Sequence, residues 1–282
     1  PHARARILSI DTTEAEKSRG VICILTAGDL PDRNYIDYGA RERIALAKTE
    51  VSHFGQEVAI VAAETEKQAI DALKKIRVQY KVLRPVTDAK AALQKGAPGV
   101  RPDRGPSNIS DNLHRIFGDM EVAEKSTSLK VSGKYEYGIQ AHACMEPHAV
   151  VASWKAGEGV LHIYAPTQAA RNLQFEIAHM VGLETEQVRV HSVAVGGDFG
   201  ARVRACEIEV LASHLSHKTG QPVKIELSRD EEFAHTKHQH GSSIELETAV
   251  DDQGKFLSRK ASLIFENGAF IHGSANTMSY CS

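Results

Sequence analysis

Residues 188–220 read VRVHSVAVGGDFGARVRACEIEVLASHLSHKTG, and this stretch decides the fold of the second half of the chain. The apolar residues at its start predict a buried strand over 188–195. GGDFG at 196–200 predicts a tight loop. Residues 206–220 follow a helical period and end on a glycine, as helices with a left-handed cap commonly do. The apolar positions of that helix are Ile208, Leu211 and Leu215.

The segments around this stretch continue the alternation of strands and helices. Residues 149–168 contain two apolar runs separated by the triplet GEG at 157–159, which indicates a hairpin. Residues 169–183 predict a helix that stops at Gly182 and places Leu173, Ile177 and Met180 or Val181 on one face. Further strands are predicted at 129–137, 222–227, 243–250 and 255–265, the last two flanking the turn DDQG.

The first part of the chain predicts a smaller mixed unit of strands and helix. Apolar runs at 21–26 and 58–63 precede a helical pattern at 66–76, in which Ile70, Leu73 and Ile76 recur at a spacing of three. The run RVQYKV at 77–82 then alternates like a strand. This unit ends near Val86.

Residues 88–125 predict a linker, because their middle is rich in Gly, Pro, Asn and Asp and has no sustained apolar period. We therefore expect a first domain over 1–87, the linker over 88–125 and a second domain over 126–282. Since strands and helices alternate through the second domain and hairpins lie at its flanks, the predicted class is α+β, or mixed α/β.

Composition excludes several classes of partner. The chain has 34 Lys and Arg against 36 Asp and Glu, so it lacks the basic excess with which proteins bind nucleic acids or anionic membranes. Its apolar runs are far shorter than the roughly 20 residues of a membrane-spanning helix. The four cysteines are scattered, which suggests neither a zinc site nor a disulfide framework and favours a reducing cytoplasm.

The loop Gly196, Gly197, Asp198, Phe199 and Gly200 is the most informative candidate site. Its glycines permit positive φ angles and close approach of backbone N–H groups to a bound group, and the following helix points its positive end toward the loop. The loop has neither the order of a nucleotide P-loop nor that of a dinucleotide fold, and Asp198 would repel a phosphate. The alternative is a strand-to-helix turn whose glycines only relieve backbone strain.

Gln168 in APTQ is a second candidate, because it ends a strand and opens a helix. Its amide can donate to an oxo or carbonyl oxygen and still accept from the backbone. The alternative is that Thr167 or Gln168 simply caps the helix.

Two groups of histidines resemble metal ligands only superficially. His142, Glu146 and His148 lack the helical HExxH spacing, and Pro147 interrupts them, so we expect structural roles for these residues. The histidines of HTKHQH lie beside charged residues, which favours a solvated face over a metal site. These histidines are His235, His238 and His240.

Several stretches, in order and with consistent spacing, resemble the large subunit of the molybdenum hydroxylases, the family of xanthine dehydrogenase, aldehyde oxidase and carbon monoxide dehydrogenase. The first part resembles the α/β hammerhead domain that opens those subunits, and the second resembles their first molybdopterin-binding domain. The stretches that carry the resemblance to the hammerhead domain are 1–15, 20–30 and 51–80. Those that carry the resemblance to the molybdopterin domain are 140–154, 165–172, 188–202, 218–233 and 266–270.

The resemblance implies roles for individual residues. Gln168 matches the glutamine that approaches the apical oxo ligand of molybdenum, and Gly196–Gly200 matches the loop whose backbone contacts the metal-pterin centre. The commoner sequence in the family is GGGFGG followed by a basic residue. In this chain Asp198 replaces one of those glycines, and Arg202 is the basic residue. Ala201 also replaces a glycine. Val203 stands where purine-oxidising members have an acidic residue, which argues against xanthine as the substrate.

The resemblance also implies an activity and its partners. Family members oxidise an aldehyde, N-heterocycle or related electron-poor carbon with water as oxygen source. Their catalytic glutamate lies near the distant end of the subunit, so we expect no catalytic residue in this chain and no activity of the chain alone. The implied cofactor is molybdenum-molybdopterin, expected in its cytosine dinucleotide form. The implied partners are a complementary molybdopterin-binding chain or domain, an iron-sulfur subunit with [2Fe–2S] and a flavin subunit with FAD.

There are two alternatives: an unrelated α/β binding module whose glycine loop holds a small anion, and a truncated, non-catalytic scaffold or assembly relative without bound cofactor. Asp198, Ala201 and the early end of the chain point toward the scaffold interpretation.

Overall fold

The computed structural model describes residues 1–31, 35–37, 41–101 and 105–270. The chain divides into two compact units, each built from two separate stretches. Unit 1 comprises residues 1–85 and 141–237, and unit 2 comprises 86–140 and 238–282. No helix of the described residues has the length and apolar character needed to cross a membrane.

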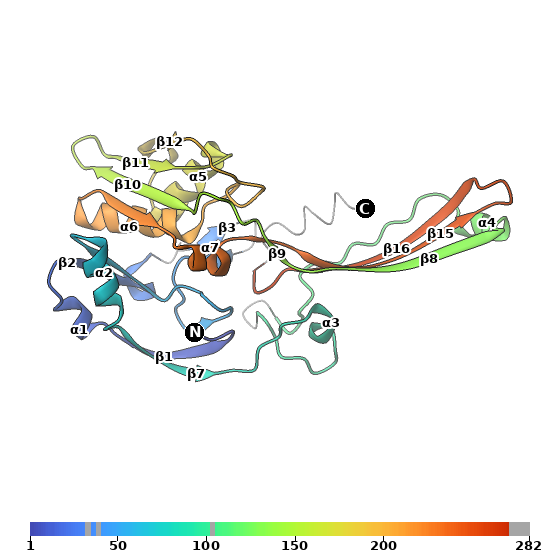
Figure 1. Ribbon diagram of the computed structural model, residues 1–282, viewed down its shortest axis with the longest axis horizontal. Helices are drawn as coiled ribbons and strands as arrows, with labels where there is room; N and C mark the ends of the chain where they lie inside the picture. The colour runs from blue at the N-terminus through green and yellow to red at the C-terminus, as the bar shows by residue number, and fades with distance from the viewer. Residues whose placement is uncertain (32–34, 38–40, 102–104, 271–282) are drawn as a thin grey trace. The chain divides into compact units, whose positions relative to one another are not determined.

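The N-terminal stretch of unit 1 forms small antiparallel sheets with short helices (Figure 1). One sheet has the strand order β5-β1-β7, and the pairs β2-β6 and β3-β4 form two more. The strands are β1 (Ala5–Asp11), β2 (Val21–Thr26), β3 (Tyr35–Asp37), β4 (Arg41–Ile44), β5 (Glu50–Val51), β6 (Ala59–Ala63) and β7 (Arg77–Val82). The helices are α1 (Thr13–Glu16), η1 (Ala27–Asp29) and α2 (Glu66–Leu73).

The predicted helix at 66–76 is confirmed as α2, but its buried side differs from the apolar spacing. Ala72 is fully buried and packs with Val61, whereas Ile70 and Leu73 are nearly half exposed. A small residue at the contact lets the short helix lie close to the β2-β6 sheet, which leaves the larger side chains at the rim.

The second stretch of unit 1 is a four-stranded mixed sheet with the order β12-β11-β10-β13. Strands β10 and β11 form the predicted antiparallel hairpin, while β11 and β12 run parallel. Helices α5 and α6 pack against this sheet and each other (Figure 1). The elements are β10 (Ala149–Lys155), β11 (Val160–Ala165), α5 (Ala170–Val181), η3 (Thr185–Gln187), β12 (Val188–Ser192), α6 (Glu207–Thr219), β13 (Val223–Glu226) and α7 (Arg229–His235).

Both predicted helices of this sheet have the predicted inward faces and glycine caps. Gly182 and Gly220 adopt left-handed φ angles of 82° and 67°, which end α5 and α6. The side chains predicted to face inward are buried in one core: Leu173, Ile177, Met180, Ile208, Leu211 and Leu215. That core also contains Leu25 of β2, so both stretches of unit 1 share it.

The strand predicted over 188–195 is shorter than expected, because β12 ends at Ser192. Ser192 pairs with Ala165, the last residue of β11. Pro166 follows, and a proline has no N–H with which to continue the ladder. The chain beyond Ser192 therefore leaves the sheet early and enters the glycine loop.

Unit 2 contains an antiparallel three-stranded sheet with the order β16-β15-β8. Its strands are β8 (Leu129–Tyr137), β15 (Gly241–Val250) and β16 (Phe256–Glu266), all at predicted positions. The stretch predicted as a linker, residues 88–125, belongs to this unit. It contains two short helices, α3 (Ala89–Ala92) and α4 (Met120–Lys125). The short strands β9 (Gln140–Ala141) and β14 (His238–Gln239) form a separate pair.

Candidate functional site

The two sequence candidates, Gln168 and the glycine loop, lie together at one edge of the mixed sheet. Because β11 and β12 are parallel, their carboxyl ends meet at the same edge, and the segments that follow them emerge side by side. Thr167 joins the segments: its hydroxyl donates to the backbone carbonyl of Arg202 at 3.0 Å. It also accepts from the N–H of Ala169 at 3.1 Å, so the capping role considered for Thr167 is present as well.

Three residues of the loop have positive φ angles, which residues other than glycine rarely adopt. Gly197 and Gly200 have φ angles of 116° and 101°, and Phe199 has a φ of 54°. A Cβ at Gly196 would lie 2.5 Å from the Cβ of Glu146, so no larger residue fits there without a shift. Close packing therefore requires a glycine at 196. The positive φ angles at 197 and 200 favour glycine at those two positions.

Asp198 holds the loop from within. Its Oδ1 accepts the backbone N–H groups of Gly200 at 2.9 Å and Arg202 at 3.0 Å, and its side chain is buried. With its nitrogen turned toward this carboxylate, the Gln168 amide donates to Oδ1 at 2.8 Å and to Oδ2 at 3.1 Å. The charge of Asp198 is thus directed inward at hydrogen-bond donors of the site.

Glu146 and Arg202 form the ion pair beneath the loop. The Arg202 guanidinium is buried and donates to Oε2 of Glu146 at 2.5 Å, and the same oxygen accepts the N–H of Gly196 at 2.7 Å. Partial burial opposes ionisation of Glu146, but the Gly196 N–H and Arg202 lower the pKa of its carboxyl below the usual value. Arg202, predicted as the basic residue of the site, therefore supports the loop from below through Glu146.

The segment around Glu146 is fixed to the rest of the site by two further residues. Cys144 lies under the loop, with its Sγ 3.6 Å from the Asp198 carbonyl. Arg229 donates to the backbone carbonyls of Cys144 and Met145, both at 2.7 Å. This floor was expected to be structural, and sequence reasoning did not connect it with the loop.

A buried histidine–glutamate pair lies next to this floor. The Nδ1 of His148 is 2.9 Å from Oε1 of Glu232, and its backbone N–H donates to Oε2 at 2.8 Å. Burial by itself would lower the pKa of His148, but the neighbouring Cys206 sulfur and the Glu232 carboxylate raise it to about 11. The expected structural role of His148 is confirmed.

The outer surface of the loop is open to a ligand. Gln168 and Phe199 are exposed, and no acceptor among the described residues takes the N–H groups of Gly197 or Phe199. Backbone donors at a glycine loop, with an exposed amide beside them, suit electronegative oxygen or sulfur atoms of a bound group. The described residues include no cluster of three or more His, Cys, Asp or Glu able to hold a metal.

The histidines of HTKHQH do not form the predicted solvated face. His235 is partly buried, with its Nδ1 3.0 Å from Oε1 of Glu57. His240 is also partly buried, with its Nδ1 3.1 Å from the carbonyl of Glu266. Local charge in the sequence misled this prediction, because both partners are distant in the chain.

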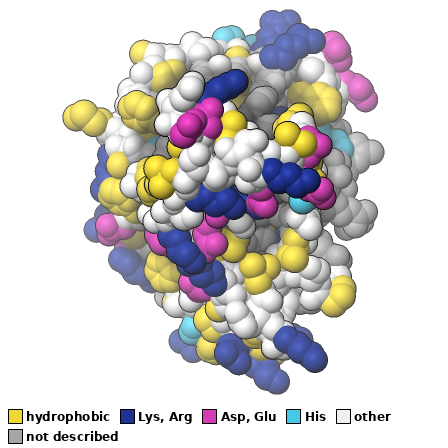
Figure 2. Space-filling view, turned by 90° about the vertical axis from the view of Figure 1, so that its right-hand side faces the viewer, with side chains coloured by type: hydrophobic (Ala, Val, Ile, Leu, Met, Phe, Trp, Pro, Cys, Tyr) yellow, Lys and Arg dark blue, Asp and Glu magenta, His cyan; other side chains and the backbone are white. Residues whose placement is uncertain are grey.

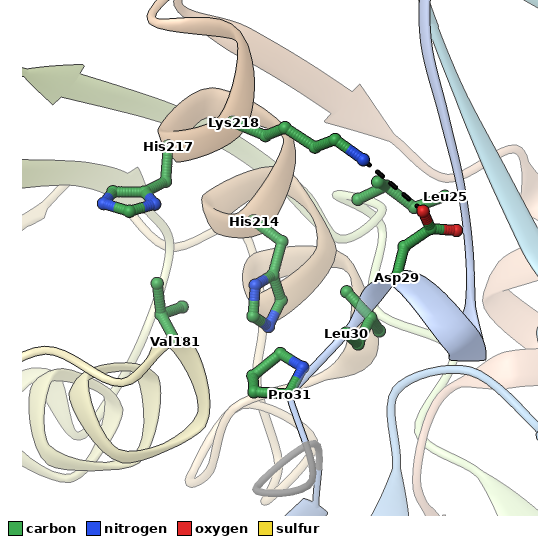
Figure 3. Close-up of a pocket in the computed structure, with 8 residues that line it drawn as sticks. All are labelled: Leu25, Asp29, Leu30, Pro31, Val181, His214, His217 and Lys218. Atoms are coloured by element: carbon green, nitrogen blue, oxygen red, sulfur yellow. Dashed lines mark hydrogen bonds and ion pairs between the residues drawn. The ribbon is translucent and has the colours of Figure 1, made fainter.

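A hollow in unit 1 lies between the β2–η1 segment and α6 (Figure 3). Leu30 and Pro31 line one side, and His214 points toward them from the helix (Figure 3). Lys218 pairs with Asp29 at 3.5 Å at its rim. None of its lining residues belongs to the glycine loop or to 165–168, so it is separate from the candidate site.

The fold and the loop together define a family. Residues 1–84 match the aldehyde oxidase and xanthine dehydrogenase a/b hammerhead domain, and residues 101–282 match the molybdopterin cofactor-binding domain. The chain therefore belongs to the molybdenum hydroxylase family of xanthine dehydrogenase and aldehyde oxidase, and corresponds to part of its large, molybdopterin-binding subunit. The predicted family and mixed α/β fold are confirmed.

Individual relatives are considerably longer than this chain. It is 32% identical over 273 residues to a probable xanthine dehydrogenase subunit of Bacillus subtilis, covering 96% of this chain and 35% of that protein. It is 27% identical over 270 residues to the nicotinate dehydrogenase large molybdopterin subunit of Eubacterium barkeri, covering 96% and 62%. Among solved structures, quinoline 2-oxidoreductase from Pseudomonas putida 86 matches with a TM-score of 0.88 and 27% identity, over 96% of this chain and 35% of that one.

Proposed function

We propose that this chain supplies one side of a molybdenum-molybdopterin site in a hydroxylase that oxidises an aldehyde, N-heterocycle or related electron-poor carbon. The observation that supports it most directly is the meeting of Gln168 with the loop at 196–200, in which the N–H groups of Gly197 and Phe199 have no acceptor among the described residues. When bound, the cofactor supplies two-electron redox chemistry, with water as the source of oxygen.

The residues of this chain would bind and orient that cofactor. Asp198 holds the Gln168 amide nitrogen, and the second N–H of that nitrogen would donate to an oxygen ligand of the metal. The N–H groups of Gly197 and Phe199 would donate to the cofactor, while Arg202 and Glu146 keep the loop in place from below. Catalytic proton transfer is assigned to no residue of this chain.

The identity of the substrate is proposed only by class. Val203 in place of an acidic residue still argues against purines, although the curated relatives include xanthine dehydrogenases. We further propose the cytosine dinucleotide form of the cofactor, a complementary molybdopterin-binding chain or domain, and iron-sulfur and flavin subunits carrying [2Fe–2S] and FAD. The free thiols of Cys23, Cys144 and Cys206 would suit a reducing cytoplasm.

One of the three features that pointed toward the scaffold alternative, Asp198, also fits a cofactor loop. Asp198 was the residue that most clearly departed from a cofactor loop, yet it satisfies N–H groups of that loop and faces Gln168. The loop with Asp198 is therefore an internally braced version of the site.

The test is molybdenum and pterin content of the protein purified from its native host with its associated subunits. We expect near-stoichiometric molybdenum and pterin, and a several-fold loss of both in Gln168→Ala. Gln253→Ala, at an exposed turn in unit 2, is the matched control and should retain both. Folded protein free of molybdenum and pterin, or a Gln168→Ala variant with full content, would contradict the proposal.

A further inference from the structure

The sheet of unit 2 has two faces of opposite chemistry. Successive residues of β8 point to opposite sides, so its sequence LKVSGKYEY separates into apolar and polar sets. One side carries Leu129, Val131, Gly133, Tyr135 and Tyr137. The other carries Lys130, Ser132, Lys134 and Glu136. Antiparallel sheets that cover something on one side and meet water on the other show this alternation.

The polar face is already satisfied within unit 2. Lys134 pairs across strands with Glu245 at 2.6 Å, and Lys130 approaches Glu247 at 3.6 Å. The helices α3 and α4 contact β16, and their residues reach this same face: Lys90 pairs with Glu136 at 2.5 Å. This face therefore needs no further partner.

The same face is mostly apolar across all three strands, although Val131 lies opposite Thr248, which lies opposite Arg259. Tyr135 lies opposite Ile244, which lies opposite Leu263, and Gly133 lies opposite Leu246, which lies opposite Ala261. Tyr135 also lies over Gly133, where a Cβ would meet its ring within 3 Å. The β8 residues of this face remain about half exposed or more: Leu129 57%, Val131 60%, Tyr135 57% and Tyr137 48%.

A largely apolar, exposed sheet face of this kind is typical of an interface, because monomeric proteins rarely leave one in water. Aromatic side chains, Tyr in particular, are enriched at protein interfaces. Figure 2 views the molecule from the right-hand side of Figure 1 and shows basic and acidic side chains intermixed with hydrophobic ones. The whole chain has 34 Lys and Arg against 36 Asp and Glu, so it lacks the basic excess that would draw a nucleic acid or an anionic membrane, which favours a protein partner.

The relatives contain a further part that this chain does not match. The chain covers 35% of the Bacillus subtilis protein and 62% of the Eubacterium barkeri molybdopterin subunit, so these subunits hold a large part with no counterpart here. In the quinoline oxidoreductase chain the matched share is also 35%. A permanent association with that remaining part suits an apolar, weakly charged contact surface.

We propose that the apolar face of the β16-β15-β8 sheet binds the remaining part of the molybdopterin subunit, whether that part is joined to this chain or is a separate polypeptide. This inference rests on the proposed function, because it takes the protein to be a working molybdopterin subunit. It assigns an interaction surface to residues outside the cofactor loop.

A photo-crosslinking amino acid placed at Val131 tests the occupant directly. Val131 faces the apolar side, and its neighbour Ser132 faces the polar side, so the same probe at Ser132 is the matched control. The protein is purified from its native host with all associated parts, irradiated, and the adducts are mapped by mass spectrometry. We expect the Val131 probe to join the remaining part of the subunit and the Ser132 probe to form no such adduct.

Lysine substitutions test the energetics of the same surface. Val131→Lys with Tyr135→Lys places two charges on the apolar face, whereas Ser132→Lys with Ser262→Lys places two on the polar face, opposite Glu247 and Glu245. Tyrosine nitration reports burial: Tyr137 should react at least about ten-fold more slowly in the native protein than in denaturant, as expected for a water-excluded interface core. The apolar-face pair should restore most of its reactivity, and the polar-face pair should not.

Three results would overturn the inference. These are a Val131 adduct with a second copy of this chain, with lipid or with an iron-sulfur or flavin subunit; no adduct at all; or rapid native nitration of Tyr137. Molybdenum and pterin are measured in the same preparation. Stoichiometric cofactor with an unoccupied apolar face would reject the interface and leave the proposed function standing. Absence of cofactor with a protected face would reject the proposed function alone.

Discussion

The buried guanidinium of Arg202 donates to the carboxylate of Glu146, which lies 56 residues earlier in the chain. That carboxylate also accepts the N–H of Gly196, so a single ion pair connects the start of the glycine loop, its end and the floor beneath it. The cofactor loop is therefore fixed by residues outside it.

Glu146→Gln should destabilise the protein and loosen the loop. The substitution leaves the buried Arg202 facing a neutral amide, and uncompensated buried charge costs on the order of 2–4 kcal/mol. Chemical denaturation should show this loss in the free energy of unfolding, together with a lower molybdenum content. Glu186→Gln, at an exposed position of unit 1, is the control and should change neither quantity.

Asp198→Ala should weaken the loop more than Asp198→Asn. Alanine removes the acceptor for the N–H groups of Gly200 and Arg202, and each unsatisfied donor costs about 1–3 kcal/mol. Asparagine keeps an acceptor oxygen at the same place. Hydrogen exchange of the Gly200 and Arg202 amides should accelerate in the alanine variant and stay slow in the asparagine variant; equal rates in both would refute the bracing role of Asp198.

Glu232→Gln should destabilise unit 1 through His148. The Glu232 carboxylate accepts from both the backbone and the ring of His148, whose pKa is raised to about 11, so the amide leaves a buried cation with a neutral partner. A loss of about 3 kcal/mol is expected in the free energy of unfolding at neutral pH. Glu158→Gln, in the exposed hairpin turn, should cost less than about 0.5 kcal/mol.

His214 should make the protein less stable in mild acid. Burial, with His217 nearby, lowers the pKa of His214 from 6.5 to about 4. A lowered folded pKa means that the unfolded state binds the proton first, so this stability is complete above pH 6.5 and is lost as the pH falls toward 4. Urea titrations across that range should show a loss on the order of 3 kcal/mol.

The variant His214→Phe should remove that acid sensitivity while filling a similar volume in α6. His114→Phe, at an exposed position of unit 2, is the control and should keep the wild-type pH dependence. If both variants lose stability with acid as the wild type does, another buried group is responsible.

Local patterns predicted the elements but not the contacts that make the site. Gly220 and the period around Ile208 and Leu215 are short-range signals, and both were confirmed. The meeting of Gln168 with Asp198 depends on the parallel pairing of β11 and β12, which no local pattern specifies.

Contacts between residues far apart in the chain also explain what the sequence analysis missed or predicted wrongly. Glu146 gave no functional signal because its partner Arg202 lies 56 residues away. His235 was expected in water because its neighbours in sequence are charged, yet it contacts Glu57. Val193–Val195 continue the apolar run of β12 but leave the sheet, because Pro166 follows the end of β11 and cannot continue the ladder.

The shared core of unit 1 has a consequence for synthesis. Leu25 of β2 is buried together with Leu211 of α6, yet residues 86–140 of unit 2 are translated between the two stretches of unit 1. At ribosomal speeds of roughly 5–20 residues per second, the N-terminal stretch waits on the order of ten seconds for its partner. During that interval Leu25 lacks the partners that bury it in the shared core, so the nascent chain exposes apolar surface until the second stretch, which ends at residue 237, has left the ribosome.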